Sequence, residues 1–133
     1  MSILVDSISV PFHTSSHRSS IEIESVVWST KPPTVVTVRS FETGEQVKIN
    51  FKDDCGLRIL NEVDLAGWWM NAKGSPLSES WLFEIKEGGW LESESKRSDF
   101  SLRYSKEKIR EFLITSESEC VSILTLSEPK ITT

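Results

Sequence analysis

Tryptophans and carboxylates are the residue types in this 133-residue chain that could carry chemistry, and they gather between residues 60 and 91. Four of the five tryptophans lie there, with acidic side chains beside them in sequence. Two acids flanking a sugar that stacks on aromatic rings is the arrangement used in glycoside hydrolysis. One hypothesis is therefore a small-molecule or carbohydrate pocket, with or without catalysis. Its residues are Trp68, Trp81, Glu84 and Glu92.

Other catalytic groups lack the spacing that enzymes use. The sequence contains no nucleophile elbow, zinc-protease motif, phosphate loop or dinucleotide fingerprint. His13 and His17 lie in a serine-rich segment that disfavours the helix a metal pair four residues apart needs. Cys55 and Cys120 match no metal or redox spacing; we expect Cys55 to be exposed and Cys120 to be buried. The sequence predicts no catalytic residue, no cofactor and no metal ion.

The charge of the chain restricts its partners. Twenty acidic residues against 15 basic ones give a net charge of −5. A nucleic-acid binder needs a Lys/Arg face, which this composition does not favour. No apolar run approaches the roughly 20 residues of a membrane span, and the N-terminus lacks signal-peptide features. We expect a cytoplasmic protein that binds neither nucleic acid nor membranes and keeps its thiols reduced.

Hydrophobic periodicity predicts an α+β fold in one domain over residues 1–133, with 1–20 and 128–133 partly loose. The hairpin over 34–51 is the clearest element, because apolar residues alternate on both arms and Gly44 suits a positive φ in the turn. The segment 21–28 should join it in a meander. Further strands are expected at 57–60, 81–85, 111–115 and 120–126.

One main helix is expected at about 62–72, capped by Asn61 and carrying Leu65, Trp68, Trp69 and Ala72 on one face. The predicted architecture is a curved, largely antiparallel sheet of about six strands packed on this helix.

The tryptophans divide between core and surface. Trp28 and Trp81 occupy strand positions, which predicts that they are buried. Adjacent helical residues point about 100° apart, so Trp69 should reach the rim when Trp68 faces the core. Trp90 follows the Gly88-Gly89 turn and is the second rim residue. Tryptophan is enriched at binding hot spots, so we predict a Trp-edged acidic surface for a partner protein. Its residues are Glu62, Asp64, Trp69, Glu87, Trp90 and Glu92.

Three segments carry a resemblance: LNEVDLAGWW (60–69), WLFEIKEGGWL (81–91) and EFLITSESECVSIL (111–124). They resemble segments of small single-domain bacterial proteins of unassigned function, some of them similar to the immunity proteins that accompany polymorphic toxins. The resemblance implies a cytoplasmic, non-enzymatic binder whose acidic face is set against a toxin, often a basic nuclease. A third hypothesis is a structural subunit whose Trp-rich face closes a homodimer.

Overall fold

A computed structural model shows how the chain folds. It describes residues 3–7, 21–31, 33–61, 72–74, 81–96, 108–116 and 118–132, with the backbone alone for 3–7 and 72–74. Within these ranges the chain forms ten strands and one helix. In order they are β1 (Ile3–Ser7), β2 (Ile21–Val27), β3 (Thr34–Ser40), β4 (Gln46–Phe51), β5 (Asp54–Asn61), β6 (Ala72–Gly74), β7 (Leu82–Glu87), α2 (Trp90–Glu94), β8 (Arg110–Thr115), β9 (Glu119–Thr125) and β10 (Lys130–Thr132).

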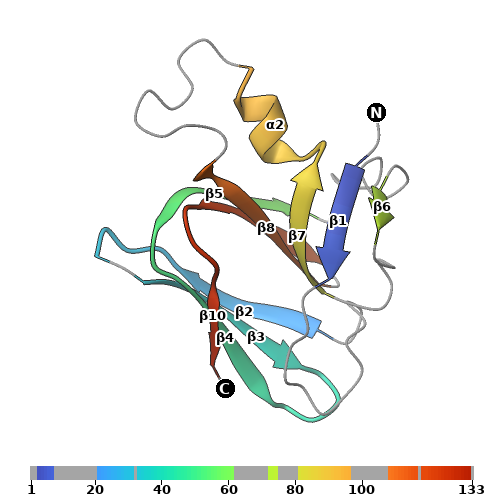
Figure 1. The fold of residues 1–133 in the computed structure, drawn as a ribbon. Coiled ribbons are helices and arrows are strands. Elements are labelled where there is room, and N and C mark those ends of the chain that lie inside the picture. Colours follow the sequence, from blue (N-terminus) through green and yellow to red (C-terminus); the bar gives the residue numbers. More distant parts are fainter. Residues whose placement is uncertain are drawn as a thin grey trace.

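The strands form two sheets that pack face to face (Figure 1). Sheet A has the strand order β5-β9-β8-β7-β1-β6, and sheet B has the order β10-β4-β3-β2. The pairing of β1 with β6 is parallel, and the other pairings are antiparallel. In Figure 1, α2 lies above sheet A at the end of β7, and sheet B lies below.

Alternation of side chains builds sheet B. In β3, Val36 and Val38 are fully buried, whereas Val35 and Thr37 between them are only partly buried on the outer face. The β3–β4 turn places Gly44 at φ 75°, where glycine carries no steric penalty. Strand β2 pairs with β3, and β3 pairs with β4. The predicted hairpin and the meander are therefore confirmed.

Sheet A depends on strands that are apolar on both faces. Strand β7 lies between β8 and β1, and its residues from Leu82 to Ile85 are all buried. Strands β8 and β9 form the closing hairpin that the sequence predicts, with Ile114 opposite Val121. A continuous buried run of this kind is typical of central strands covered on both sides.

The hydrophobic core lies between the two sheets. Phe51 of β4 and Phe112 of β8 meet across it, with ring centroids 6.2 Å apart and planes tilted by 58°. Burial of this apolar surface is the main stabilising contribution, at about 25 cal/mol for each Å² removed from water. The core cluster comprises Ile21, Val36, Val38, Val47, Ile49, Phe51, Trp81, Leu82, Phe112, Ile114, Val121 and Ile123.

The predicted architecture is right in its α+β class and its largely antiparallel pairing, but one sheet of about six strands on one main helix is wrong. The described helix, α2, has five residues. The expected helix at 62–72 lies outside the described residues apart from Ala72, which begins β6. In the described core, sheet B takes the place that the prediction gave to the helix, because the apolar faces of the two sheets cover each other.

Both strand tryptophans were predicted to be buried, and the structure confirms this for one of them. Trp81 is fully buried, as predicted. The prediction for Trp28 is wrong: its side chain is 59% exposed, because β2 ends one residue earlier at Val27, which is itself 57% exposed. At the C-terminal end, Lys130–Thr132 pair with β4 as β10, although 128–133 were expected to be partly loose. No helix in the described ranges is long and apolar enough to cross a membrane.

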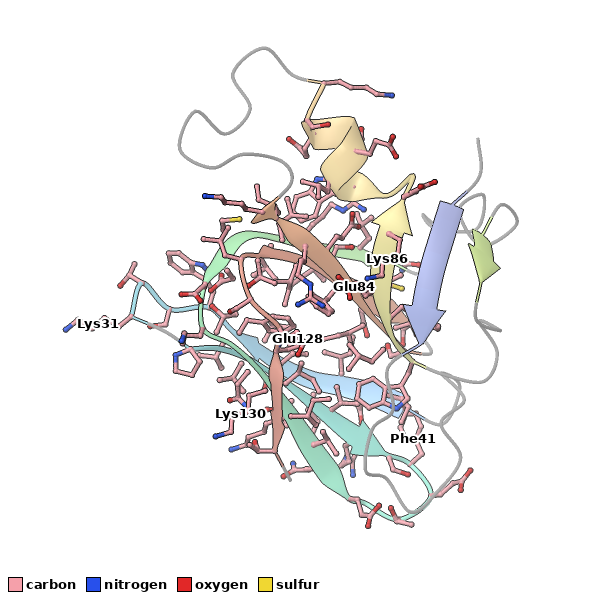
Figure 2. The ribbon with its side chains drawn as sticks, in the orientation of Figure 1. Lys31, Phe41, Glu84, Lys86, Glu128 and Lys130 are labelled. Atoms are coloured by element: carbon pink, nitrogen blue, oxygen red, sulfur yellow. The ribbon has the colours of Figure 1, made fainter. Side chains whose placement is uncertain are left out.

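Two phenylalanines at the ends of neighbouring strands test where the core lies. Phe51 is fully buried, and Phe41, at the end of β3, is 51% exposed (Figure 2). We expect Phe51→Ala to lower the free energy of unfolding by about 3–5 kcal/mol, because it removes a ring and leaves a cavity between the sheets. Phe41→Ala should change it by about 0.5 kcal/mol or less. Urea denaturation measures both, and equal effects would place the core elsewhere.

Candidate functional site

The site is built on the tight turn that joins β7 to α2. Gly88 has φ 79°, a left-handed conformation that favours glycine. Gly89 is needed for a different reason, because a Cβ there would lie 2.6 Å from Glu111 Oε1 and 2.6 Å from Ile85 Cγ2. The two glycines therefore have separate tasks. The first reverses the chain, and the second lets the turn approach β8 closely.

The carboxylate of Glu111 holds the first turn of α2. The backbone N–H of Trp90 donates to Glu111 Oε2 at 3.1 Å, and that of Leu91 donates to Oε1 at 2.8 Å. Helix N-termini have N–H groups without intrahelical partners, and here no N-cap side chain supplies an acceptor. An acid in β8, some twenty residues along the chain, does so instead. Helix α2 is thus fixed to sheet A by a side chain that is only 4% exposed.

Two further acids on α2 accept hydrogen bonds, one from the turn and one from the Trp90 side chain. Gly88 donates its backbone N–H to Glu92 Oε2 at 2.5 Å, so Glu92 reaches back over the helix start much as in a capping box. The indole Nε1 of Trp90 donates to Glu94 Oε1 at 3.0 Å, one helical turn away. These bonds fix the orientation of the partly exposed Trp90 ring.

The guanidinium group of Arg58 lies over the face of the Trp90 ring. Its guanidinium carbon is 4.9 Å from the centroid of Trp90, within the range of a cation–π contact. Burial lowers the pKa of Arg58, and the nearby charges of Glu111 and Glu94 oppose that shift. Arg58 comes from β5, so the ring is held between an edge strand of sheet A and its own helix.

Glu111 is the buried carboxylate of this group. Burial raises its pKa, while the N–H groups of Leu91 and Trp90 and the charge of Arg58 lower it. The balance is a raised pKa, so desolvation is the larger effect. An open cavity of about 350 Å³ lies beside it, and Glu87, Glu92 and Glu111 are among its lining residues.

The structure brings part of the predicted surface together. Glu87, Trp90 and Glu92 lie on the turn and the helix, with Glu87 exposed and the other two partly exposed. Glu62, Asp64 and Trp69 lie outside the described residues. The predicted surface did not include Glu94, Arg58 or Glu111. The four-residue spacing of Trp90 and Glu94 is a helical signal that could have identified Glu94, whereas no local pattern connects α2 with Arg58 or Glu111.

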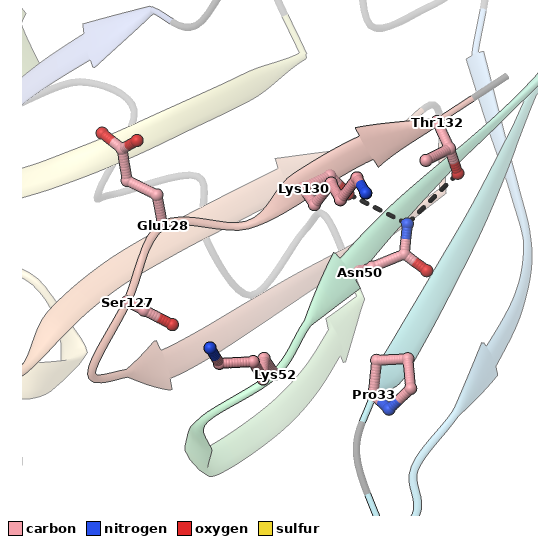
Figure 3. A pocket seen from close by; sticks show the side chains of 7 residues that line it. All are labelled: Pro33, Asn50, Lys52, Ser127, Glu128, Lys130 and Thr132. Carbon is pink, nitrogen blue, oxygen red and sulfur yellow. Dashed lines mark hydrogen bonds between the residues drawn. The ribbon is translucent and has the colours of Figure 1, made fainter.

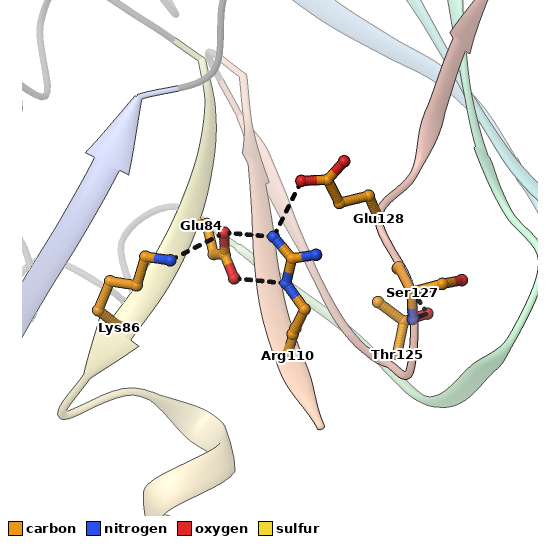
Figure 4. A network of polar contacts seen from close by, with 6 residues as sticks. All are labelled: Glu84, Lys86, Arg110, Thr125, Ser127 and Glu128. Carbon is orange, nitrogen blue, oxygen red and sulfur yellow. Dashed lines mark hydrogen bonds and ion pairs between the residues drawn. The ribbon is translucent and has the colours of Figure 1, made fainter. Parts of the chain in front are cut away.

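Of the four residues of the alternative pocket, the three described ones, Trp81, Glu84 and Glu92, do not line one cavity together among the two cavities of described residues. Trp81 is fully buried, Trp68 lies outside the described residues, and Glu84 does not line the cavity that contains Glu92. Glu84 instead accepts two bonds of 2.8 Å from Arg110, and Lys86 Nζ lies 3.1 Å from its Oε1 (Figure 4). Arg110 in turn contacts Glu128 at 3.2 Å.

These ion pairs determine the protonation of Glu84. The hydrogen bonds from Arg110 are the largest effect and lower the pKa of Glu84 below its usual value of 4.5. A carboxyl that stays ionised at neutral pH is a poor general acid, which needs a pKa near the working pH. This geometry supports a structural role for Glu84, joining β7 to β8.

The described residues hold no group of three or more His, Cys, Asp and Glu side chains that could bind a metal ion. Both cysteines are free, Cys55 exposed and Cys120 buried, as predicted. Burial, with the charge of Asp54, raises the pKa of the Cys55 thiol. A raised pKa lowers the thiolate fraction and hence the reactivity of the sulfur.

No known protein family, characterised protein or solved structure matches the chain.

Gly89 and Gly44 form a matched pair of substitutions. In Gly89→Ala the new methyl group must displace the Glu111 carboxylate, which should cost about 1–3 kcal/mol and expose the N–H groups of Trp90 and Leu91 to hydrogen exchange. In Gly44→Ala there is open space, and only the positive φ costs about 1–2 kcal/mol. Exchange at α2 should stay unchanged in Gly44→Ala. Unchanged exchange in Gly89→Ala would contradict the role of Glu111.

The lowered pKa of Glu84 should make the stability of the fold depend on pH. Because its folded-state pKa lies below the unfolded value, its contribution is present above about pH 4.5 and is lost as pH falls through the folded pKa. We expect Glu84→Gln to lower the free energy of unfolding by about 1–3 kcal/mol at pH 7 and by progressively less below pH 4.5.

Denaturation curves between pH 3 and pH 7 measure this difference. Glu128→Gln is the control, because Glu128 is 73% exposed and makes a single contact with Arg110. Its effect should stay below about 1 kcal/mol across the range. A Glu84→Gln effect that does not depend on pH would contradict the ion-pair account.

Proposed function

We propose that this chain is a non-enzymatic protein-binding domain that recognises a basic partner through the Trp90 surface, defined as Glu87, Trp90, Glu92 and Glu94. The observation that carries the proposal is a partly exposed indole held by Glu94, with the carboxylates of Glu87 and Glu92 on the same β7–α2 segment. Large, rigid aromatic side chains bordered by polar groups are the usual centres of binding energy at interfaces.

The Trp90 surface is organised before any partner arrives. Glu94 fixes the indole nitrogen, Arg58 covers one side of the ring, and Glu111 holds the helix backbone. Ordering a side chain on binding costs about 0.5–1.5 kcal/mol, so a ring that is already ordered loses less. This favours binding of another macromolecule over simple packing of a surface residue.

Charge indicates the class of partner. The chain carries a net charge of −5, and the acids of the Trp90 surface lie at one end of sheet A. An acidic surface accelerates encounter with a basic protein and complements a basic active site. A cytoplasmic inhibitor of the immunity type, set against a basic toxin, is the most specific form of the proposal. Glu62, Asp64 and Trp69 lie outside the described residues and stay a prediction from the sequence.

Affinity capture followed by calorimetry tests the proposal. The intact chain, carrying a tag, is used as bait in extracts of its source cells, and each captured protein is purified and titrated separately. We expect Trp90→Ala to weaken binding at least tenfold, as removal of a hot-spot tryptophan does. The triple change Glu87→Gln, Glu92→Gln and Glu94→Gln should slow association and reduce its dependence on salt.

Matched controls lie on other parts of the molecule. Trp28→Ala removes an exposed tryptophan from the end of β2, and Glu42→Gln, Glu45→Gln and Glu119→Gln together remove three charges away from α2. Both controls should bind like the unmodified chain. Equal losses of affinity in Trp90→Ala and Trp28→Ala would contradict the assignment of the interface to the Trp90 surface. A loss of affinity confined to Trp28→Ala would place the interface at the end of β2. Glutamine keeps the acceptor oxygen at each position, so folding should be preserved.

A further inference from the structure

A second hollow lies on the opposite part of the molecule, on the outer face of sheet B. It is an open groove of about 630 Å³ between β10, the end of β4 and the start of β3 (Figure 3). Its volume falls within the range of pockets that bind small molecules. None of its lining residues belongs to the Trp90 surface, so the groove requires an explanation of its own.

Strand register explains why polar side chains gather there. Phe51 points into the core, so Asn50 and Lys52 on either side of it point outward. Lys130 pairs with Asn50 in the antiparallel ladder, and directly opposed residues share a face. Two ammonium groups and one amide are therefore placed around the same hollow, as Figure 3 shows.

Two lysines and one glutamate are the charged residues among those that line the groove, so its lining has a net positive charge. Neither Lys52 nor Lys130 forms an ion pair with a carboxylate in the described part of the chain. Glu128 also lines the groove, but its carboxylate is bound to Arg110. Arg110 and Lys86 together balance Glu84 and Glu128, so that network is neutral. Asp53, beside Lys52 in sequence, accepts a hydrogen bond of 2.9 Å from the Ser127 hydroxyl and pairs with neither lysine within the described residues.

Asn50 is positioned by its neighbours. Its Nδ2 donates to the backbone oxygen of Lys130 at 2.9 Å and to Thr132 Oγ1 at 3.2 Å. Both donors of the amide are thus used within the protein, and the side chain is fixed in the floor of the groove. The ammonium groups of Lys52 and Lys130 therefore line the groove together with a hydrogen-bonded amide.

The wall of the groove is mostly carbon, contributed by the ring of Pro33 and the stems of the polar side chains. A ligand that fits both features has a charged head and an apolar body. We propose that this groove binds a small organic anion, whose carboxylate or phosphate head lies between Lys52 and Lys130 and whose apolar part rests against Pro33. Two ammonium groups are too few for a nucleic-acid backbone, which needs an extended basic face.

NMR titrations of the full chain with four probes test the charged head and the apolar body of the ligand separately. Phenyl phosphate and benzoate have a head and a body, inorganic phosphate has the head alone, and benzyl alcohol has the body alone. We expect the two complete probes to shift the Asn50 side-chain amide and the β10 backbone signals. Inorganic phosphate and benzyl alcohol should bind about tenfold more weakly. The stronger of the complete probes identifies the preferred head.

Substitutions locate the binding. Lys52→Gln and Lys130→Gln should each weaken the stronger probe about tenfold, the effect of losing one charge-assisted hydrogen bond. Lys48→Gln is the matched control: it lies on the same outer face of β4, opposite Thr132, but does not line the groove. Its affinity should match that of the unmodified chain.

Three results would overturn the proposal. Absence of shifts with every probe at millimolar concentration would leave the groove without a ligand of this class. Binding of benzyl alcohol as tight as that of benzoate would remove the role of charge. Equal losses in Lys48→Gln and Lys52→Gln would show general attraction of anions to a basic face. None of these outcomes depends on whether the Trp90 surface binds a protein.

Discussion

The carboxylate of Glu111 fixes helix α2, and with it the Trp90 surface, to sheet A. A helix of five residues cannot hold itself together in water, because forming its first turn fixes several residues for very few hydrogen bonds. Glu111 supplies acceptors for two of the unpaired N–H groups and connects them to the central part of sheet A. Burying that acid costs free energy, as its raised pKa shows, and the N–H groups together with Arg58 offset part of the cost. This contact fixes the backbone of Trp90, while Glu94 and Arg58 orient its ring.

The molecule separates its charges by location. Glu92 and Glu94 lie with Trp90 on α2, and the ion pairs of Glu84 and Arg110 form a neutral network on β7 and β8. Lys52 and Lys130, which form no ion pair within the described residues, line the groove on sheet B. The core between the sheets, with Phe51 against Phe112, keeps the two charged regions apart. The two proposals, a basic protein at the Trp90 surface and a small anion at the groove, rest on this separation of charge.

Periodicity predicted the elements whose side chains alternate between core and solvent. Val36, Val38, Val47 and Ile49 identify the β3–β4 hairpin because pairing and burial impose the same period of two. The division into two sheets could not be read in this way, since alternation shows that a face is buried but not what covers it. Trp28 was misplaced for a related reason: an apolar residue at the end of a strand pattern can extend past the edge of the partner sheet. At the site, Glu87, Trp90 and Glu92 were found because they are close in sequence, whereas Arg58 and Glu111 arrive from β5 and β8 through tertiary folding alone.

Hydrogen exchange on the complex with a captured and purified partner is the most direct measurement of the central claim. The account predicts slower exchange in the partner-bound chain across the turn and α2, from Glu87 to Glu94, with exchange in β4 and β10 unchanged. Slower exchange confined to sheet B, with α2 exchanging as in the free chain, would contradict it.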